Sequence, residues 1–148
     1  PITPEVKKLR DKIRTLLNNT AVPLPIEPFT RKAYDKLFPE GQVETPIGVV
    51  KLGEHQFEKL QTLGQEYLLG AVQQTLKYPT LILVEERNLK KTKLYIKSFI
   101  KKDKKKVVQS VVIDEATGLS ISVSTHERDL NNVVSKIKTP AQIAYIVD

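Results

Sequence analysis

Two histidines are the natural candidates for proton transfer near neutral pH in this chain of 148 residues. His126 lies in the segment Ser124–Asp129, where a β-prone run changes to a helical pattern. His55 follows a glycine at the start of another helical pattern. A histidine can act as a general acid or base because its ordinary pKa lies close to neutral pH. The sequence therefore marks His126 first, and His55 second, as catalytic candidates.

The segment Ser124–Asp129 has two interpretations, and they are compatible. Ser124 as a helix N-cap with Glu127 three residues later would form a capping box, which is a structural motif. A helix N-terminus also presents N–H groups that favour anions such as phosphate. The same environment keeps a histidine neutral and able to act as a base.

Lysines alternate with aromatic rings along the β-prone run Thr92–Lys101. Successive side chains of a strand point to opposite faces, so one face of this strand would carry Lys93, Tyr95, Lys97, Phe99 and Lys101. Such a face can pair phosphates with lysines while bases stack on the rings. The alternative is an edge hairpin whose lysines prevent pairing between sheets of different molecules.

The excess positive charge lies in one segment. The chain has a net charge of +7, and residues 91–106 hold eight lysines and one aspartate, a local balance of +7. The rest of the chain holds 16 basic and 16 acidic residues, out of totals of 24 and 17. A basic patch of this kind attracts and holds a polyanion. The predicted hairpin tip carries the anchoring lysines Lys101, Lys104, Lys105 and Lys106.

The first half of the chain is predicted to be mainly helical. Apolar spacing predicts a helix over Pro4–Asn18, and three prolines in Ala21–Pro28 predict a linker. Phe29–Phe38 reads as a short helix with Thr30 as its N-cap, and Val43–Leu52 as a hairpin or bent strand. Glu54–Leu76 keeps helical spacing and is predicted as one long helix with a break at its first glycine.

The second half is predicted to be a strand meander with one helix. β-branched runs cover Thr80–Glu85, Thr92–Lys101, Lys106–Ile113, Leu119–Ser124 and Ile143–Val147. Helical spacing returns over Glu127–Lys138. We therefore expect an α+β fold with N-terminal helices, a roughly four-stranded antiparallel sheet, and helices packed on one face only. Residues 1–28 would form an accessory helix and linker, and residues 29–148 the main domain.

Several function classes are disfavoured by composition. The chain has no cysteine, which excludes thiolate chemistry, and no methionine, which suggests a piece of a longer polypeptide. No apolar run is long enough to span a membrane. The carboxylates follow no metal-ligand spacing, and no nucleotide-binding loop is present. The remaining chemistry needs an acid, a base and cations, without metal or cofactor. Cleavage of RNA by its own 2′-hydroxyl is such a reaction.

Three stretches of the chain carry a resemblance to a known family: Val43–Gly53, Tyr95–Phe99 and Ser122–Asp129. With them, the region from Phe29 to Asp148 resembles the phage-type nuclease domains grouped with barnase, EndoU, colicin tRNases and RelE. It is most similar to the branch found in phage MuF-type and polyvalent proteins. This resemblance implies N-terminal helices, a four-stranded antiparallel sheet, and metal-independent RNA cleavage on an exposed sheet face.

The resemblance also implies roles for individual residues. His126 would be the acid or base, with Ser124 and Thr125 orienting the phosphate, and Lys97 would be the cation that stabilises the transition state. Tyr95 would stack a base or share in proton transfer. The resemblance fixes no role for His55, which stays a catalytic candidate because it is one of the two histidines. The RNA-binding set would be Lys93, Phe99, Lys101, Lys104, Lys105, Lys106 and Arg128.

The expected function is an endoribonuclease toxin or phage effector domain within a larger protein. Its partners would be RNA, with tRNA one candidate, and an acidic antitoxin or immunity protein. It would act in the cytoplasm of a target or host cell, after delivery with a phage particle or as a secreted effector. The alternatives are a noncatalytic nucleic-acid-binding or phage structural module, and a domain whose basic hairpin binds an acidic protein.

Overall fold

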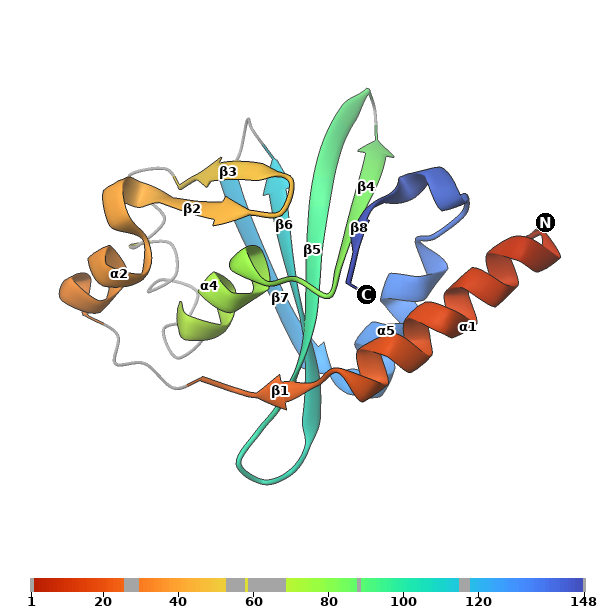
Figure 1. Cartoon of the computed structure of the whole chain (residues 1–148), viewed down its shortest axis with the longest axis horizontal. Helices are drawn as coiled ribbons and strands as arrows, with labels where there is room; N and C mark the ends of the chain where they lie inside the picture. The colour runs from red at the N-terminus through yellow and green to blue at the C-terminus, as the bar shows by residue number, and fades with distance from the viewer. Residues whose placement is uncertain are drawn as a thin grey trace.

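The computed structural model describes residues 2–25, 30–52, 58, 69–87, 89–114 and 118–147, with the backbone alone at residues 87 and 118–129. The order of elements along the chain (Figure 1) is α1 (Pro4–Asn19), β1 (Val22–Pro23), α2 (Arg31–Leu37), the 3-10 turn η1 (Pro39–Gly41), β2 (Gln42–Thr45), β3 (Gly48–Lys51), α4 (Leu69–Lys77), β4 (Leu81–Arg87), β5 (Lys90–Ile100), β6 (Lys106–Asp114), β7 (Gly118–Thr125), α5 (His126–Ser135), η3 (Pro140–Gln142) and β8 (Ile143–Ile146). The predicted α+β class is confirmed.

The described strands form a six-stranded main sheet and a separate β2–β3 hairpin. The main sheet has the order β7-β6-β5-β4-β8, and all of these neighbours pair antiparallel. The expected four-stranded meander is therefore β4 to β7, and β8 extends it along β4. The sixth strand is β1, which pairs parallel with Phe99 and Ile100 of β5. It comes from the proline-rich segment that was predicted as a linker only.

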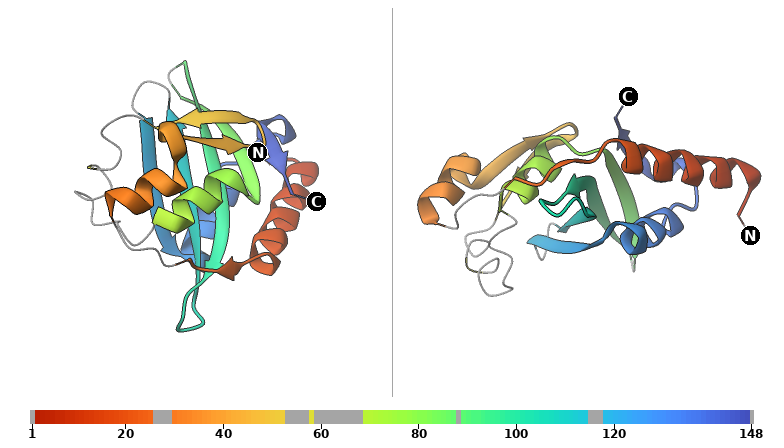
Figure 2. Two further views of the ribbon diagram at one scale, coloured as in Figure 1. Left: turned by 60° about the vertical axis from the view of Figure 1, so that its left-hand side comes forward. Right: turned by 90° about the horizontal axis from the view of Figure 1, so that it is seen from below.

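Both faces of the main sheet are covered, so the prediction of helices on one face is wrong. Helices α1 and α5 pack on one face, while α4, α2 and the β2–β3 hairpin cover the other (Figures 1 and 2). The apolar run at the start of β4 shows why: Leu81 and Leu83 pack toward α1 and α5, and Ile82 packs toward α4. A strand that is buried on both faces has a continuous apolar run instead of alternation. That run was a signal in the sequence for a sheet with two covered faces.

Helix α1 packs directly on the main sheet and contributes side chains to its core, although the sequence had suggested an accessory helix. Ile13 and Leu17 are fully buried against the sheet and α5. Thr3 caps the helix, because its Oγ1 accepts a hydrogen bond from the Val6 backbone N–H at 3.2 Å. The Arg10 guanidinium donates to the carbonyl of Ile137 at 2.8 Å and to that of Ser135 at 3.1 Å. These bonds tie α1 to the end of α5.

The covering elements on the second face follow the local sequence signals. Helix α2 starts after Thr30, whose Oγ1 accepts from the Ala33 N–H at 3.0 Å, as predicted. The β2–β3 hairpin turns between Thr45 and Gly48, and Gly48 has a φ of 131°, which suits glycine. Of the long helix predicted over Glu54–Leu76, the structure describes Glu58 and the end, which is α4.

Candidate nucleic-acid interface

The β5–β6 hairpin carries the lysine-rich segment, and it extends beyond the body of the domain (Figure 1). Pairing between the two strands runs from Lys93 opposite Ile113 to Ile100 opposite Lys106. Strand β1 pairs with Phe99 and Ile100, the last two residues of β5, and the Leu24 N–H donates to the Ile100 carbonyl at 2.9 Å. The hairpin is therefore a supported projection of the sheet.

The hairpin tip, residues 101–105, has a backbone closed by its own hydrogen bonds. The Lys101 N–H donates to the Lys105 carbonyl at 2.8 Å, and the Lys104 N–H donates to the Lys101 carbonyl at 2.9 Å. Asp103 Oδ1 accepts from the Lys105 N–H at 3.0 Å, while Lys104 adopts a φ of 70°. The aspartate that interrupts the lysine run thus serves the turn. This network closes the backbone of the turn, and the lysines that it carries are exposed.

Four lysines at the tip are exposed and form no ion pair within the described residues: Lys101, Lys102, Lys104 and Lys105. Lys102 was omitted from the predicted binding set. Lys106 differs, because its ammonium donates to the backbone carbonyl and to Oδ1 of Asn18, both at 3.1 Å. Asn18 lies in the last turn of α1, where a cation interacts favourably with the helix dipole. Lys106 is therefore an anchor between α1 and the hairpin.

Lys97 is partly buried and bonded to the end of α4. Its ammonium donates to the Tyr78 carbonyl at 2.7 Å. Burial lowers the pKa of Lys97 below its ordinary value, because water solvates the ammonium less well there. The Tyr78 N–H in turn donates to the Gln74 carbonyl at 2.7 Å. Lys97 of β5 thus connects the β5–β6 hairpin to the residue that follows α4.

The aromatic residues that were predicted to face RNA are buried. Tyr95 and Phe99 retain 1% and 0% of their exposure. The Tyr95 hydroxyl lies 3.2 Å from the Thr45 Oγ1, and burial raises the pKa of Tyr95. The predicted open face of cations and rings is therefore wrong, because both rings are buried and Tyr95 packs against α4 and the β2–β3 hairpin. Lys93, on the same face, is exposed.

A buried glutamine lies directly opposite Lys97 in the sheet. Gln109 of β6 pairs with Lys97 and has no exposed surface. Neither polar atom of its side-chain amide has a hydrogen-bond partner. Directly opposite residues in an antiparallel pair have Cβ atoms about 5 Å apart. Lys97 and Gln109 thus form a polar pair inside a mainly apolar face.

Strand register separates two parts of the predicted catalytic site. Position 124 pairs with Val108, which pairs with Ser98, so this row lies on the α1–α5 face. Lys97 belongs to the neighbouring row with Gln109, and neighbouring rows lie on opposite faces. Lys97 and position 124 therefore lie in rows on opposite faces of the sheet, and the roles predicted for Lys97 and Ser124 stay predictions.

The other catalytic candidates are described in part or lie outside the described residues. Helix α5 begins at His126, so Thr125, and not Ser124, directly precedes the helix. The side chains of Ser124, Thr125, His126 and Arg128 lie outside the description. His55 lies outside it altogether. Their predicted roles stay predictions.

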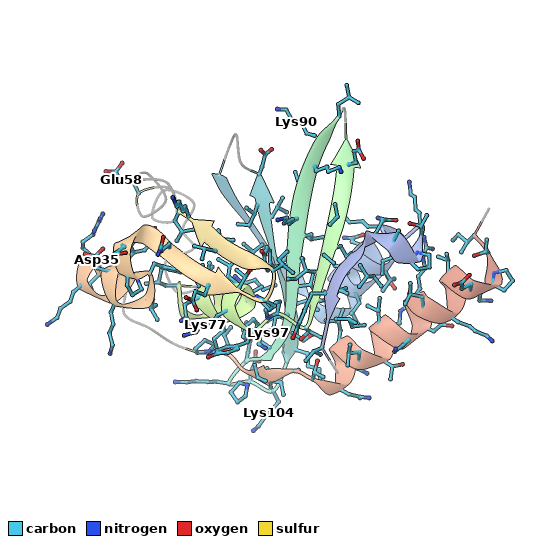
Figure 3. All side chains as sticks on the ribbon, turned by 45° about the horizontal axis from the view of Figure 1, so that its top comes forward. Asp35, Glu58, Lys77, Lys90, Lys97 and Lys104 are labelled. Carbon is cyan, nitrogen blue, oxygen red and sulfur yellow. The ribbon has the colours of Figure 1, made fainter. Side chains whose placement is uncertain are left out.

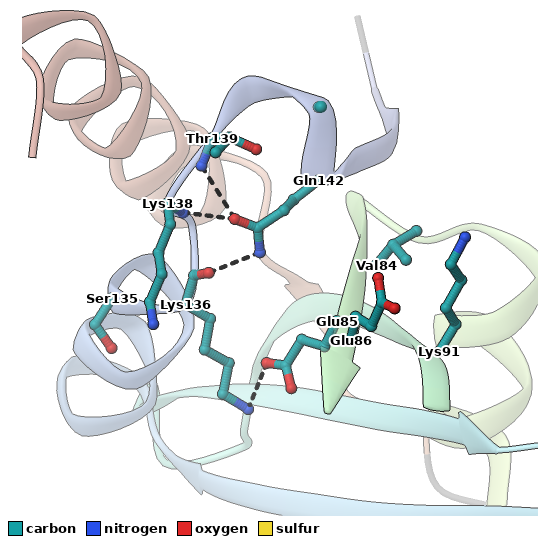
Figure 4. Close-up of a pocket in the computed structure, with 10 residues that line it drawn as sticks. Val84, Glu85, Glu86, Lys91, Ser135, Lys136, Lys138, Thr139 and Gln142 are labelled. Carbon is teal, nitrogen blue, oxygen red and sulfur yellow. Dashed lines mark hydrogen bonds and ion pairs between the residues drawn. The ribbon is translucent and has the colours of Figure 1, made fainter. Parts of the chain in front are cut away.

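A polar pocket of about 580 Å³ lies at another place, between β4 and the segment from α5 to η3 (Figure 4). The Lys136 ammonium lies 3.4 Å from the Glu85 carboxylate across it. Gln142 organises its rim, since Oε1 accepts from the N–H groups of Lys138 and Thr139 and Nε2 donates to the Lys136 carbonyl. Tyr95 and Lys97, the predicted catalytic residues whose side chains the structure describes, do not line this pocket.

Lys77 and Tyr78 lie beside Lys97, and neither was among the site residues predicted from the sequence. Tyr78 is 60% exposed, and the Lys77 ammonium lies 5.6 Å from the centroid of its ring. Figure 3 shows Lys77 and Lys97 close together, with Lys104 beyond them toward the hairpin tip. A signal was present: Tyr78 stands between Lys77 and Pro79, at the point where the predicted helix must end.

Comparisons with models of protein families, with curated proteins and with solved structures found no match. No helix in the described part of the chain is long and apolar enough to cross a membrane.

Proposed function

We propose that this domain binds RNA through phosphate contacts at the tip of the β5–β6 hairpin. The observation that supports this proposal is the set of four exposed lysines, without ion pairs among the described residues, on a tip whose backbone is closed by hydrogen bonds. Lysines that lack a protein carboxylate are available to phosphates. Their binding releases counterions from the nucleic acid, which supplies most of the affinity of a contact that does not read sequence.

The choice of RNA over DNA is supported by the resemblance to nucleases that cleave RNA. Phosphates are common to both, so the lysine tip itself would contact either polymer. An acidic inhibitor protein would bind to the same lysines, because its carboxylates would replace the phosphates. RNA and such a protein would then exclude each other from the tip.

The test is the affinity for a fluorescently labelled RNA of about 20 nucleotides, measured by anisotropy at low salt. A variant with Lys101, Lys102, Lys104 and Lys105 all changed to Gln should bind at least about tenfold more weakly, because it loses its phosphate contacts. The matched control changes four exposed lysines away from the hairpin to Gln: Lys7, Lys8, Lys12 and Lys32. Both variants lose the same net charge.

The control should keep most of the affinity of the unchanged protein. Equal losses in the two variants would mean that net charge alone attracts the RNA, and would overturn the hairpin as the binding site. Unchanged affinity in the hairpin variant would overturn it as well. Urea unfolding of each variant verifies that the fold is intact.

A second proposal is metal-independent cleavage of the bound RNA. The observation that favours it is Lys97, a partly buried cation with a lowered pKa on the strand that leads to the tip. A preorganised cation in a partly desolvated site stabilises the charge that develops on phosphorus oxygens during transfer. The resemblance assigns proton transfer to His126, and this role is tested separately from that of Lys97, because strand register places position 124 and Lys97 on opposite faces of the sheet.

Incubation of the domain with total RNA in EDTA tests cleavage separately from binding. The unchanged protein should cut RNA, while His126→Ala and Lys97→Met should each lose most of the activity, and His126→Ala should keep the affinity. RNA that stays intact with the unchanged protein would reject the nuclease proposal and leave the binding proposal standing. Activity that disappears only on chelation would contradict the metal-independent mechanism.

A further inference from the structure

We propose that Tyr78 is a base-stacking residue, so that this surface binds single-stranded RNA with an unpaired base on the Tyr78 ring. This inference rests on the RNA binding proposed above and names the form of RNA that the surface takes. Tyr78 directly follows α4 and lies next to Lys97 of β5. It would supply the aromatic contact that the sequence had suggested for Tyr95.

The exposure of Tyr78 is unusual within the part of the chain that the structure describes. The exposed large hydrophobic residues there are Ile2, Val49, Tyr78 and Leu89, and Tyr78 is the one with an aromatic ring. Tyr78 is 60% exposed, whereas Tyr34 and Tyr95 are at most 4% exposed. An exposed ring offers a π-face to a base, and stacking of this kind tolerates any of the four bases.

The backbone of Tyr78 is held from two sides. Its N–H donates to the Gln74 carbonyl, and its carbonyl accepts from the Lys97 ammonium, both at 2.7 Å. These bonds fix the point from which the ring projects, while the ring itself contributes little to the core. Because the backbone of Tyr78 is already fixed, this platform, the Tyr78 ring, loses little conformational entropy when a base binds to it.

Two cations lie beside Tyr78 and could contact the phosphates of a strand whose base stacks on the ring. The Lys77 ammonium lies 5.6 Å from the ring centroid, and Lys97 contacts the Tyr78 carbonyl. Along β5, the tip begins at Lys101, four residues after Lys97, which corresponds to about 13 Å. Stacked nucleotides of one strand rise about 3.4 Å each, so a segment of roughly four nucleotides would connect the ring to the tip. Figure 3 shows the same sequence of cations from Lys77 and Lys97 to Lys104.

A single strand fits this surface better than a duplex does. Bases in a duplex are stacked on each other and cannot offer a face to Tyr78, whereas an unpaired base can. The lysine tip alone would hold both forms by their phosphates. The ring therefore adds affinity for the single strand only.

The experiment measures binding of an unstructured 12-nucleotide RNA, and of the same strand in a duplex, to the unchanged protein and three variants. Tyr78→Ala should weaken binding of the single strand by about 5- to 150-fold, which is the range for loss of one stacked base. Its affinity for the duplex should stay within about twofold. Tyr78→Phe should retain single-strand binding because it retains the ring. The hairpin variant with four Lys→Gln changes should lose affinity for both forms.

The outcomes separate this inference from the proposed function. Equal single-strand affinity of Tyr78→Ala and the unchanged protein, with loss in the hairpin variant, would overturn the stacking role and keep RNA binding. Equal losses of Tyr78→Ala for both RNAs would also overturn it. No binding of either RNA by the unchanged protein would reject the proposed function and the inference together. A cross-link between 5-iodouridine RNA and Tyr78, mapped by mass spectrometry, should accompany the expected result.

Discussion

The β5–β6 hairpin has two lysine-bearing regions in opposite environments. The middle of β5, Lys93–Phe99, alternates lysines with aromatic rings; both rings are buried, and the Tyr95 ring packs under α4 and the β2–β3 hairpin. The tip that follows, residues 101–105, is exposed along its whole length. The difference shows that alternation identifies two faces of a strand, but does not identify which of them meets water. What covers a face depends on elements far away in the chain.

The largest effect is expected from truncation of a ring in the middle of β5. Tyr95→Ala should lower the free energy of unfolding by about 3–5 kcal/mol, because it leaves a cavity among α4, β2 and β5. Lys93→Ala, at an exposed position on the same strand face, should change it by no more than about 0.5 kcal/mol. Urea unfolding followed by circular dichroism measures both.

Tyr95→Phe separates the ring from its hydroxyl. This variant keeps the buried ring and loses the contact with the Thr45 hydroxyl, so it should cost about 0.5–1.5 kcal/mol. A loss below about 1 kcal/mol for Tyr95→Ala would mean that the ring is not packed. In that case the face would be open, as the alternation pattern had suggested.

Much of the fold could be predicted from sequence, because its signals are local. The N-caps Thr3 and Thr30, the turn before Gly48 and the β-branched runs of β4 to β8 each depend on neighbouring residues. The pairing of β1 with Phe99 could not be predicted, since it joins residues 77 positions apart. The covering of both faces of the main sheet could not be predicted either, because it also depends on contacts between distant parts of the chain.

The second prediction concerns the tip and is measured as salt dependence. For single-stranded RNA, log affinity falls with log salt at a slope of about −0.7 for each phosphate neutralised. Four lysine contacts at the tip should therefore make the slope steeper by about 2 to 3, and roughly 20- to 50-fold in affinity should be lost between 50 and 200 mM salt. The variant with Lys101, Lys102, Lys104 and Lys105 changed to Gln should show the shallower slope. Identical slopes in the two proteins would contradict direct phosphate contacts at the tip.

The candidate site was less predictable than the fold, for physical reasons. Charge density along the sequence located the tip, because adjacent lysines on a hairpin turn remain exposed. The convergence of Lys97 with Ser124 depended on strand register, and a shift of one residue changes the face. Tyr78 belongs to the proposed RNA-binding surface because it is exposed at the end of α4, and its exposure cannot be deduced from the residue type alone.

The third prediction tests the polar pair inside the covered face. Gln109→Leu should raise the free energy of unfolding by about 1 kcal/mol, because it removes a buried amide that lacks hydrogen-bond partners. Gln142→Leu is the matched control, since its amide makes three hydrogen bonds at the rim of the pocket. The control should lose about 1–3 kcal/mol. A loss of stability in Gln109→Leu would show that its amide is satisfied in solution.

The smallest effect should come from the pH dependence of Lys97. Burial lowers the pKa of Lys97 in the folded protein below 10.5, its ordinary value in the unfolded chain. Between these two pKa values the unfolded chain binds more protons, so the unfolding free energy rises with pH across that window. Below the folded pKa, the ammonium is charged in both states and the contribution of Lys97 is constant.

Lys97→Met removes this contribution, so the unchanged protein should gain stability relative to the variant as pH approaches 10.5. Tyr34 and Tyr95 act in the opposite direction, because burial raises the pKa of each above 10.0 and their ionisation favours unfolding. Both proteins contain these tyrosines, so their effect cancels in the difference. A difference that does not change with pH would mean that the Lys97 ammonium is as well solvated as one at the hairpin tip. The middle of β5 and the hairpin tip would then present the same kind of cation.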